Sequence, residues 1–211
     1  MDPKQTSKHP LFAYLPSIGI FLFVGLYLYS ASLFPGGSTM DLDFVGFDWV
    51  HNYWCDLMHF ETINGQPNPA EPYAVFALFL LCASVLIFFF MFANVLAPSP
   101  KWRRAIQICG TISMIFAALI FTEYHNLMIV LSSAFGLVPS FGIILGIAKS
   151  DMNFYKATGV LCVFLLLLNN LFYYSSLYLN ILPLIQKITF AIVLLWIVGL
   201  NWELARKKNL K

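Results

Sequence analysis

Charged residues are scarce in this chain. Asp, Glu, Lys and Arg make up 10% of its 211 residues, while 60% are hydrophobic. A soluble domain averages about 25% charged residues, so the shortage excludes an ordinary soluble domain and indicates that lipid is the solvent for most of the surface. The net charge of +2 provides no basic surface, and no nucleic-acid partner is expected. The length predicts a single membrane domain over residues 1–211.

Several patterns that identify functional classes are also missing. No apolar run has an acidic residue at its centre, which argues against a proton-coupled transporter. The sequence has neither an HxxxH or HExxH metal motif nor a nucleophile-elbow motif. Of four cysteines only Cys55 lies in a polar segment, so no intrachain disulfide is expected there.

What the sequence does contain is a series of long apolar runs. A helix needs roughly 20 apolar residues to cross a bilayer. The runs predict an all-α, polytopic bundle of six transmembrane helices at about 11–34, 73–97, 104–123, 126–148, 157–180 and 182–203. The first run exceeds a signal-peptide core and is expected to remain as a membrane helix.

The basic residues give this bundle a predicted orientation. Threading the chain through six spans places eleven of the twelve Lys and Arg residues on one side, with Lys187 as the exception. Lys and Arg are retained in cytoplasmic segments, so both termini are predicted to be cytoplasmic, in the cell (inner) membrane. Lys187 is expected to extend from the start of the sixth helix to the membrane interface.

The longest connection, residues 35–72, is predicted to be extracytoplasmic. Turn-forming residues open and close it, and between them Asp48 to Phe60 is predicted as a short helix with Asp48 as its N-cap. At about 100° per residue this helix is amphipathic, with a Trp- and Tyr-rich apolar side suited to lying across the outer mouth of the bundle. Long connections are often functional, which makes this segment the first candidate for a site.

One hypothesis for this segment is a metal centre. His51, Cys55 and His59 are spaced i, i+4, i+8 and, on a straight helix, cannot all bind one ion. Ligands from the turn between the third and fourth runs would be needed, and His, His and carboxylate suit a zinc ion with one open position. The alternative is a polar face that is solvated or bonded to helix ends. The hypothesis names His51, His59 and His125 as metal ligands and Asp56, His125 and Glu123 as catalytic groups, with Asn52 orienting them.

Polar residues inside the fifth run form a second candidate. Asn169 and Asn170 lie near its centre, where polar groups are costly, and Tyr173 follows one turn later. Hydrogen bonds between helices would explain the two amides at about 1 kcal/mol each. The other interpretation is that Asn169, Asn170 and Tyr173 face a bound ligand.

The long connection also contains a group of short motifs. These are Pro35-Gly36-Gly37, Gly46-Phe47, Asn52-x-x-Cys55-Asp56-Leu57 and Gly65-Gln66-Pro67-Asn68. They resemble the domain of unknown function (DUF) 998 family of six-helix membrane proteins, which is distantly similar to the Frag/DRAM/Sfk group. Cys55 stands where that family usually has Ser, and Met58 where it has Gly. The resemblance implies a six-helix fold and no established activity.

Three functional hypotheses follow. The first is an uncharacterised membrane protein that associates with membrane lipid and has a polar extracytoplasmic site formed by the first loop and the third-to-fourth hairpin. The second is a zinc-dependent membrane lipid hydrolase of ceramidase-like type. The third is a small-solute transporter.

Overall fold

The computed structural model describes residues 10–209 of the chain. Its elements in order are η1 (Pro10–Tyr14), α1 (Leu15–Leu33), η2 (Trp54–Met58), α2 (Glu71–Leu96), α3 (Pro100–Ala118), α4 (His125–Ala148), α5 (Asn153–Ser175) and α6 (Leu182–Asn209), where η denotes a 3-10 helix. Over these residues the fold has no strand beyond two isolated bridges. The all-α prediction is confirmed.

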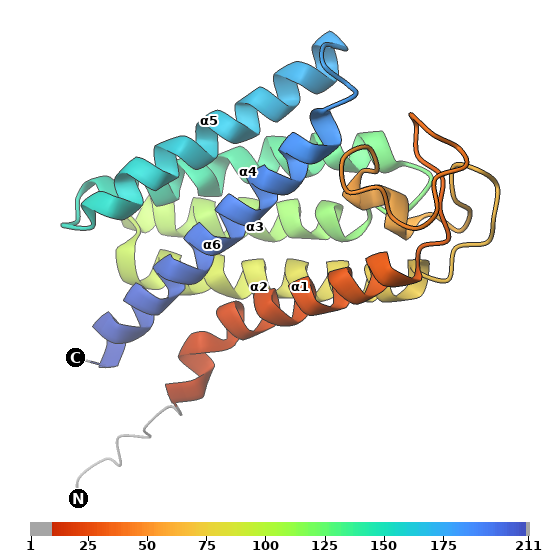
Figure 1. The fold of residues 1–211 in the computed structure, drawn as a ribbon. Coiled ribbons are helices and arrows are strands. Elements are labelled where there is room, and N and C mark those ends of the chain that lie inside the picture. Colours follow the sequence, from red (N-terminus) through yellow and green to blue (C-terminus); the bar gives the residue numbers. More distant parts are fainter. Residues whose placement is uncertain (1–9, 210–211) are drawn as a thin grey trace, which may run out of the picture.

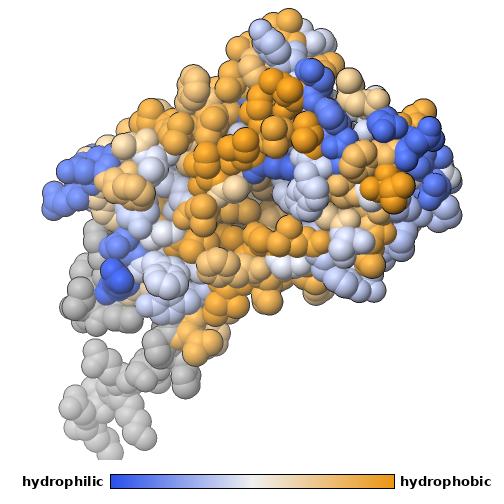
Figure 2. All heavy atoms as spheres, in the orientation of Figure 1, coloured by the Kyte–Doolittle hydropathy of each residue, from blue (hydrophilic) through white to orange (hydrophobic). Residues whose placement is uncertain are grey.

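Five of the long helices have the length and apolarity needed to cross a membrane: α1 extended by η1, α2, α4, α5 and α6, within residues 10–209. Figure 2 shows an apolar surface across the middle of the molecule, with hydrophilic groups gathered toward its two ends. The apolar surface and the five long apolar helices together indicate a multi-pass integral membrane protein. The one remaining long helix, α3, is not among these five. It carries Lys101, Arg103 and Arg104 in its first two turns. The six-span topology stays a prediction.

Consecutive helices run antiparallel, which divides the connections between two ends of the bundle (Figure 1). The long connection between α1 and α2 lies at one end, together with the α3–α4 and α5–α6 connections. We call this the loop end. The two ends of the described chain lie at the opposite, terminal end. Of the basic residues expected there, Lys4, Lys8 and Lys211 lie outside the described residues.

Helix α2 forms the centre of the bundle. Phe88 and Phe92 on α2 are fully buried, as are Ile106 on α3 and Leu200 on α6. Close packing of α2 against α4 depends on Gly146, because a Cβ there would lie 2.5 Å from the carbonyl oxygen of Leu96. Half of the most apolar window of α2 is buried, against 11% for α5. Helix α5 is therefore the least buried of the five, and most of its surface is free of contact with the other helices.

The predicted sidedness can be tested with single cysteines in a variant that lacks the four natural ones. Val45 is 86% exposed at the loop end, and Asp151 is exposed in the α4–α5 connection at the terminal end. In intact cells we expect a membrane-impermeant maleimide to label Val45→Cys, whereas Asp151→Cys should be labelled only after lysis, because Lys and Arg hold their segments in the cytosol. The reverse pattern would invert the topology.

Candidate functional site

The connection between α1 and α2, residues 34–70, folds into a compact layer at the loop end, here called the capping loop (Figure 1). Isolated bridges join Gly36 to Val45 and Glu61 to Pro67. The side-chain amide of Asn68 closes the layer by donating to the carbonyl oxygen of His59 at 2.8 Å and accepting the N–H of Ala70 at 3.0 Å. The segment is thus held by its own hydrogen bonds.

The predicted helix from Asp48 to Phe60 is wrong. The chain makes a turn at residues 49–51 and then the five-residue 3-10 helix η2. The reason is competition from side chains for backbone hydrogen bonds. Asp48 Oδ1 accepts the N–H groups of Val50 and His51 at 2.9 and 3.1 Å, as a helix N-cap does. Asp56 Oδ2, however, accepts the N–H of Tyr53 at 2.8 Å, which a continuing helix would have bonded to the carbonyl oxygen of Trp49. His51, Cys55 and His59 therefore do not form one ridge.

Asn52 is at the centre of the capping loop and is fully buried. Its Oδ1 accepts the N–H of Asp48 at 2.9 Å, and its Nδ2 donates to the carbonyl oxygen of Gly37 at 2.9 Å and to Oδ2 of Asp56 at 3.1 Å. It was predicted to orient a catalytic group. The observed contacts connect three parts of the loop, which is a structural task.

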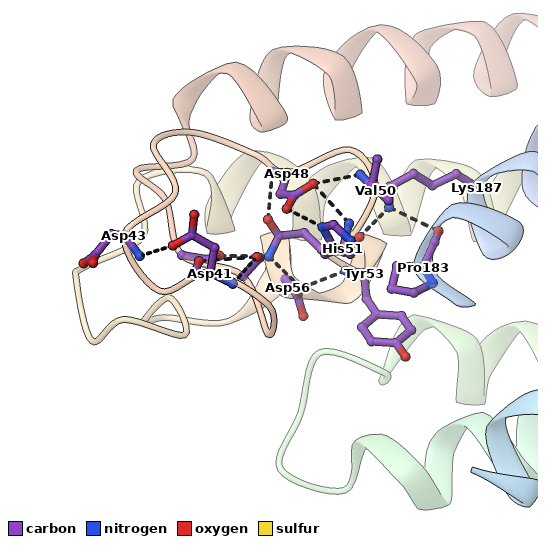
Figure 3. Close-up of polar contacts among 12 residues, drawn as sticks. Asp41, Asp43, Asp48, Val50, His51, Tyr53, Asp56, Pro183 and Lys187 are labelled. Atoms are coloured by element: carbon purple, nitrogen blue, oxygen red, sulfur yellow. Dashed lines mark hydrogen bonds and ion pairs between the residues drawn. The ribbon is translucent and has the colours of Figure 1, made fainter. Parts of the chain in front are cut away.

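Lys187 on α6 joins this loop to the bundle (Figure 3). It was expected to extend to the membrane interface, but only 8% of it is exposed, and it donates to the backbone carbonyl oxygens of Asn52 and, at 3.1 Å, Pro183. Its Nζ also lies 5.4 Å from the ring centre of Phe47 and 6.0 Å from that of Trp54, within the range of cation–π attraction. Lys187 is the one basic residue that the predicted topology places on the extracytoplasmic side. This exception was the feature of the sequence that pointed to an unusual environment for its ammonium group.

Two acids of the loop have shifted pKa values. Burial raises the pKa of Asp56, although Asn52 and the N–H of Tyr53 stabilise its carboxylate. Burial also opposes ionisation of Asp48, but hydrogen bonds from His51 and from the N–H of Val50 outweigh it and lower the pKa of Asp48. Nδ1 of His51 lies 2.8 Å from Oδ2 of Asp48 (Figure 3).

The structure does not bring the three candidate metal ligands, His51, His59 and His125, to one point. His51 is paired with Asp48, whereas the rings of His59 and His125 lie 6.1 Å apart between centroids. Glu123 is exposed in the α3–α4 connection. Within residues 10–209 no group of three or more His, Cys, Asp and Glu side chains could hold a metal ion.

The candidate residues of α5 are separated by the structure. Nδ2 of Asn169 donates to Thr189 Oγ1 on α6 at 2.6 Å, which confirms a hydrogen bond between helices. Asn170 is exposed and donates to the carbonyl oxygen of Leu166 in its own helix. The hydroxyl of Tyr173 donates to Oδ1 of Asn126, at the start of α4, at 3.1 Å.

Two buried polar atoms at the loop end have no partner among the described residues: Nε1 of Trp54 and Oδ1 of Asn169. The backbone N–H of Trp54 donates to Gln186 Oε1 at 3.4 Å, and Asn169 contacts Thr189. Gln186 and Thr189 are three residues apart on α6 and so lie on the same side of it. We call Trp54, Asn126, Asn169, Tyr173, Gln186 and Thr189 the loop-end polar layer.

Comparisons with protein-family models, with curated proteins and with solved structures give no match for this chain. The resemblance to the DUF 998 family therefore stays a prediction. Its motif residues do have a common place in the structure. Gly36 pairs with Val45, Gly37 accepts from Asn52, and Asp56 accepts from Asn52, so the motifs coincide with the bonds that fold the capping loop.

Proposed function

We propose that this protein associates with membrane phospholipid and binds a lipid headgroup in the loop-end polar layer. The observation that carries the proposal is the pair of unpartnered atoms, the indole N–H of Trp54 and the amide oxygen of Asn169. Both residues contact α6, through Gln186 and Thr189. A buried polar group without a partner is costly, and more so in a membrane, where no bulk water can replace the partner. A ligand that supplies one acceptor and one donor would satisfy both.

A phospholipid headgroup has this combination. A phosphodiester oxygen can accept from the Trp54 indole, and the ammonium of ethanolamine can donate to Oδ1 of Asn169. Helix α5, which carries Asn169, is the least buried of the five apolar helices, so a small outward movement would give a headgroup access. With both termini cytoplasmic, as the basic residues predict, the lipid comes from the extracytoplasmic leaflet.

The surface also offers a place for acyl chains. An apolar groove of about 520 Å³ runs along α2 and α6 and is lined by Leu86, Ile87, Phe90, Met91, Asn94, Val95 and Leu204. Its residues belong to the last turns of α2 and the later part of α6, so it is at the terminal end, away from the polar layer. It supports lipid contact in general and does not locate the headgroup.

The other two hypotheses gain less support. A zinc hydrolase requires a third metal ligand. Within residues 10–209 no third His, Cys, Asp or Glu side chain lies beside His59 and His125 to form such a group. Transport of a small solute has no specific observation in its favour. Both stay predictions.

Native mass spectrometry of the detergent-solubilised protein tests the proposal. The probes are phosphatidylethanolamine and a diacylglycerol with the same acyl chains, which lacks the headgroup. The test variants are Trp54→Phe and Asn169→Leu. Each removes one hydrogen-bonding atom, and a lost bond at a buried site costs about 1–3 kcal/mol, so we expect about tenfold weaker phosphatidylethanolamine binding and unchanged diacylglycerol binding.

Matched controls exist for both substitutions. Trp202→Phe alters an exposed indole on α6, and Asn170→Leu alters the neighbouring exposed amide of α5. Both controls should bind phosphatidylethanolamine as the unaltered protein does. Equal binding of the two lipids, or binding unaffected by Trp54→Phe and Asn169→Leu, would refute a headgroup site.

A further inference from the structure

His59 and His125 come from separate segments and meet at the surface of the loop end. His59 follows η2 in the capping loop, and His125 is the first residue of α4. Their ring centroids are 6.1 Å apart and the rings are inclined at 47°. With a Zn–N bond of about 2.1 Å and a ring centre about 1.1 Å behind each nitrogen, two imidazoles on one tetrahedral ion have centroids about 5–6 Å apart. The observed separation of 6.1 Å is close to the upper end of that range.

The tautomer of His125 is set by its surroundings. Its Nδ1 lies 2.6 Å from the carbonyl oxygen of Ile120, and a carbonyl can only accept, so Nδ1 carries the hydrogen. In the neutral ring, Nε2 then carries the lone pair. Histidines that bind metals typically donate their second N–H to a carbonyl or carboxylate in this way, which fixes the ring and makes the ligating nitrogen more basic.

We propose that His59 and His125 form a binding site for one divalent transition-metal ion, such as Zn²⁺ or Ni²⁺, that links the capping loop to the start of α4. Imidazole nitrogen suits these ions, and two protein ligands leave the remaining positions to water. His51 is outside the site because its Nδ1 is held by Asp48 at 2.8 Å. The proposal needs no catalysis and is independent of the lipid site at Trp54 and Asn169.

The metal would give the capping loop a further attachment to the bundle. Lys187 ties the loop to α6 through the backbone of Asn52 and packs against Phe47 and Trp54. The metal would tie the far side of the same loop, just beyond η2, to α4. Because an ion that binds only the folded arrangement stabilises it by mass action, bound metal should slow opening of the loop.

The test is Zn²⁺ titration of the protein purified without a polyhistidine tag, followed by competition with a chromophoric zinc indicator. We expect one ion per chain, with at least tenfold weaker binding in His59→Ala. In His125→Asn the side-chain amide nitrogen takes roughly the place of Nδ1, keeps the bond to Ile120 and removes Nε2, so it should also bind at least tenfold more weakly while keeping the melting temperature of the metal-free protein.

His51→Ala is the matched control, because it removes an imidazole of the same loop that lies outside the site. It should bind Zn²⁺ within about twofold of the unaltered protein. The proposal is overturned by a protein that binds no stoichiometric Zn²⁺, or by binding that survives both His59→Ala and His125→Asn.

Discussion

Replacing Lys187 with Met is expected to release the capping loop while leaving the helices folded. The substitution keeps the aliphatic length but removes the donors to the carbonyl oxygens of Asn52 and Pro183. Bonds from a charged donor are worth about 1.5–3 kcal/mol each, and relief of the burial cost of the ammonium offsets part of the loss. A net weakening of about 1.4 kcal/mol or more would raise the open population of the loop at least tenfold.

Cys55 reports this opening. Burial raises the pKa of its thiol to about 12, so in the closed loop the thiol stays protonated and reacts slowly with maleimide. With Cys82, Cys109 and Cys162 replaced by Ala, we expect Cys55 in Lys187→Met to be labelled at least ten times faster. The direction of the change in labelling rate distinguishes opening of the loop from simple loss of the charge. Lys187 lowers the pKa of Cys55, so losing the ammonium from a closed loop would slow labelling, and only opening can accelerate it.

The control is Lys156→Met on α5, because Lys156 donates only to the nearby Asn153 at an exposed site. It should label Cys55 at the unaltered rate, and circular dichroism should give the same helix content for all three proteins. An unchanged or slower rate in Lys187→Met would show that the loop is held without the lysine.

The helices could be predicted from sequence because their physics is local. Apolar runs of about 20 residues leave few alternatives to a helix in lipid, and five of the predicted runs overlap helices that could span a membrane. The boundaries shifted by several residues at the loop end. The third run was predicted to reach residue 123, but α3 ends at Ala118 and the chain turns before α4 begins at His125.

The capping loop could not be predicted in the same way, because its conformation depends on contacts distant in sequence. An amphipathic pattern from Asp48 to Phe60 suggested a helix, yet Asp56 binds the backbone N–H of Tyr53, which a helix would use. The bond from Lys187 to Asn52 spans 135 positions. The closeness of His59 and His125 was anticipated from topology alone, since both were expected at one level of the membrane.

Replacing a glycine at the base of the capping loop with alanine adds a single methyl group. We expect one such substitution to give a large loss of stability of the closed loop. Gly36 has φ +145° and bridges to Val45, and a Cβ there would lie 2.2 Å from the backbone carbonyl oxygen of Phe44. Gly46 also has positive φ, at +79°, but a Cβ there meets nothing within 4 Å. Backbone strain alone costs about 1–3 kcal/mol, whereas Gly36→Ala must in addition move backbone that no side-chain rotation can relieve.

We therefore expect Gly36→Ala to destabilise the closed loop by about 3 kcal/mol or more, and Gly46→Ala by about 1–2 kcal/mol. Hydrogen exchange of the amides in residues 34–47 measures this directly, because the N–H of Gly37 donates to Phe44 at 2.8 Å and that of Gly46 to Pro35 at 3.1 Å only while the loop is closed. Exchange should accelerate far more in Gly36→Ala, with the amides of α2 still protected. Equal acceleration in the two variants would mean that backbone strain from positive φ alone accounts for the destabilisation. The close approach of Gly36 to the carbonyl oxygen of Phe44 would then contribute nothing to the stability of the closed loop.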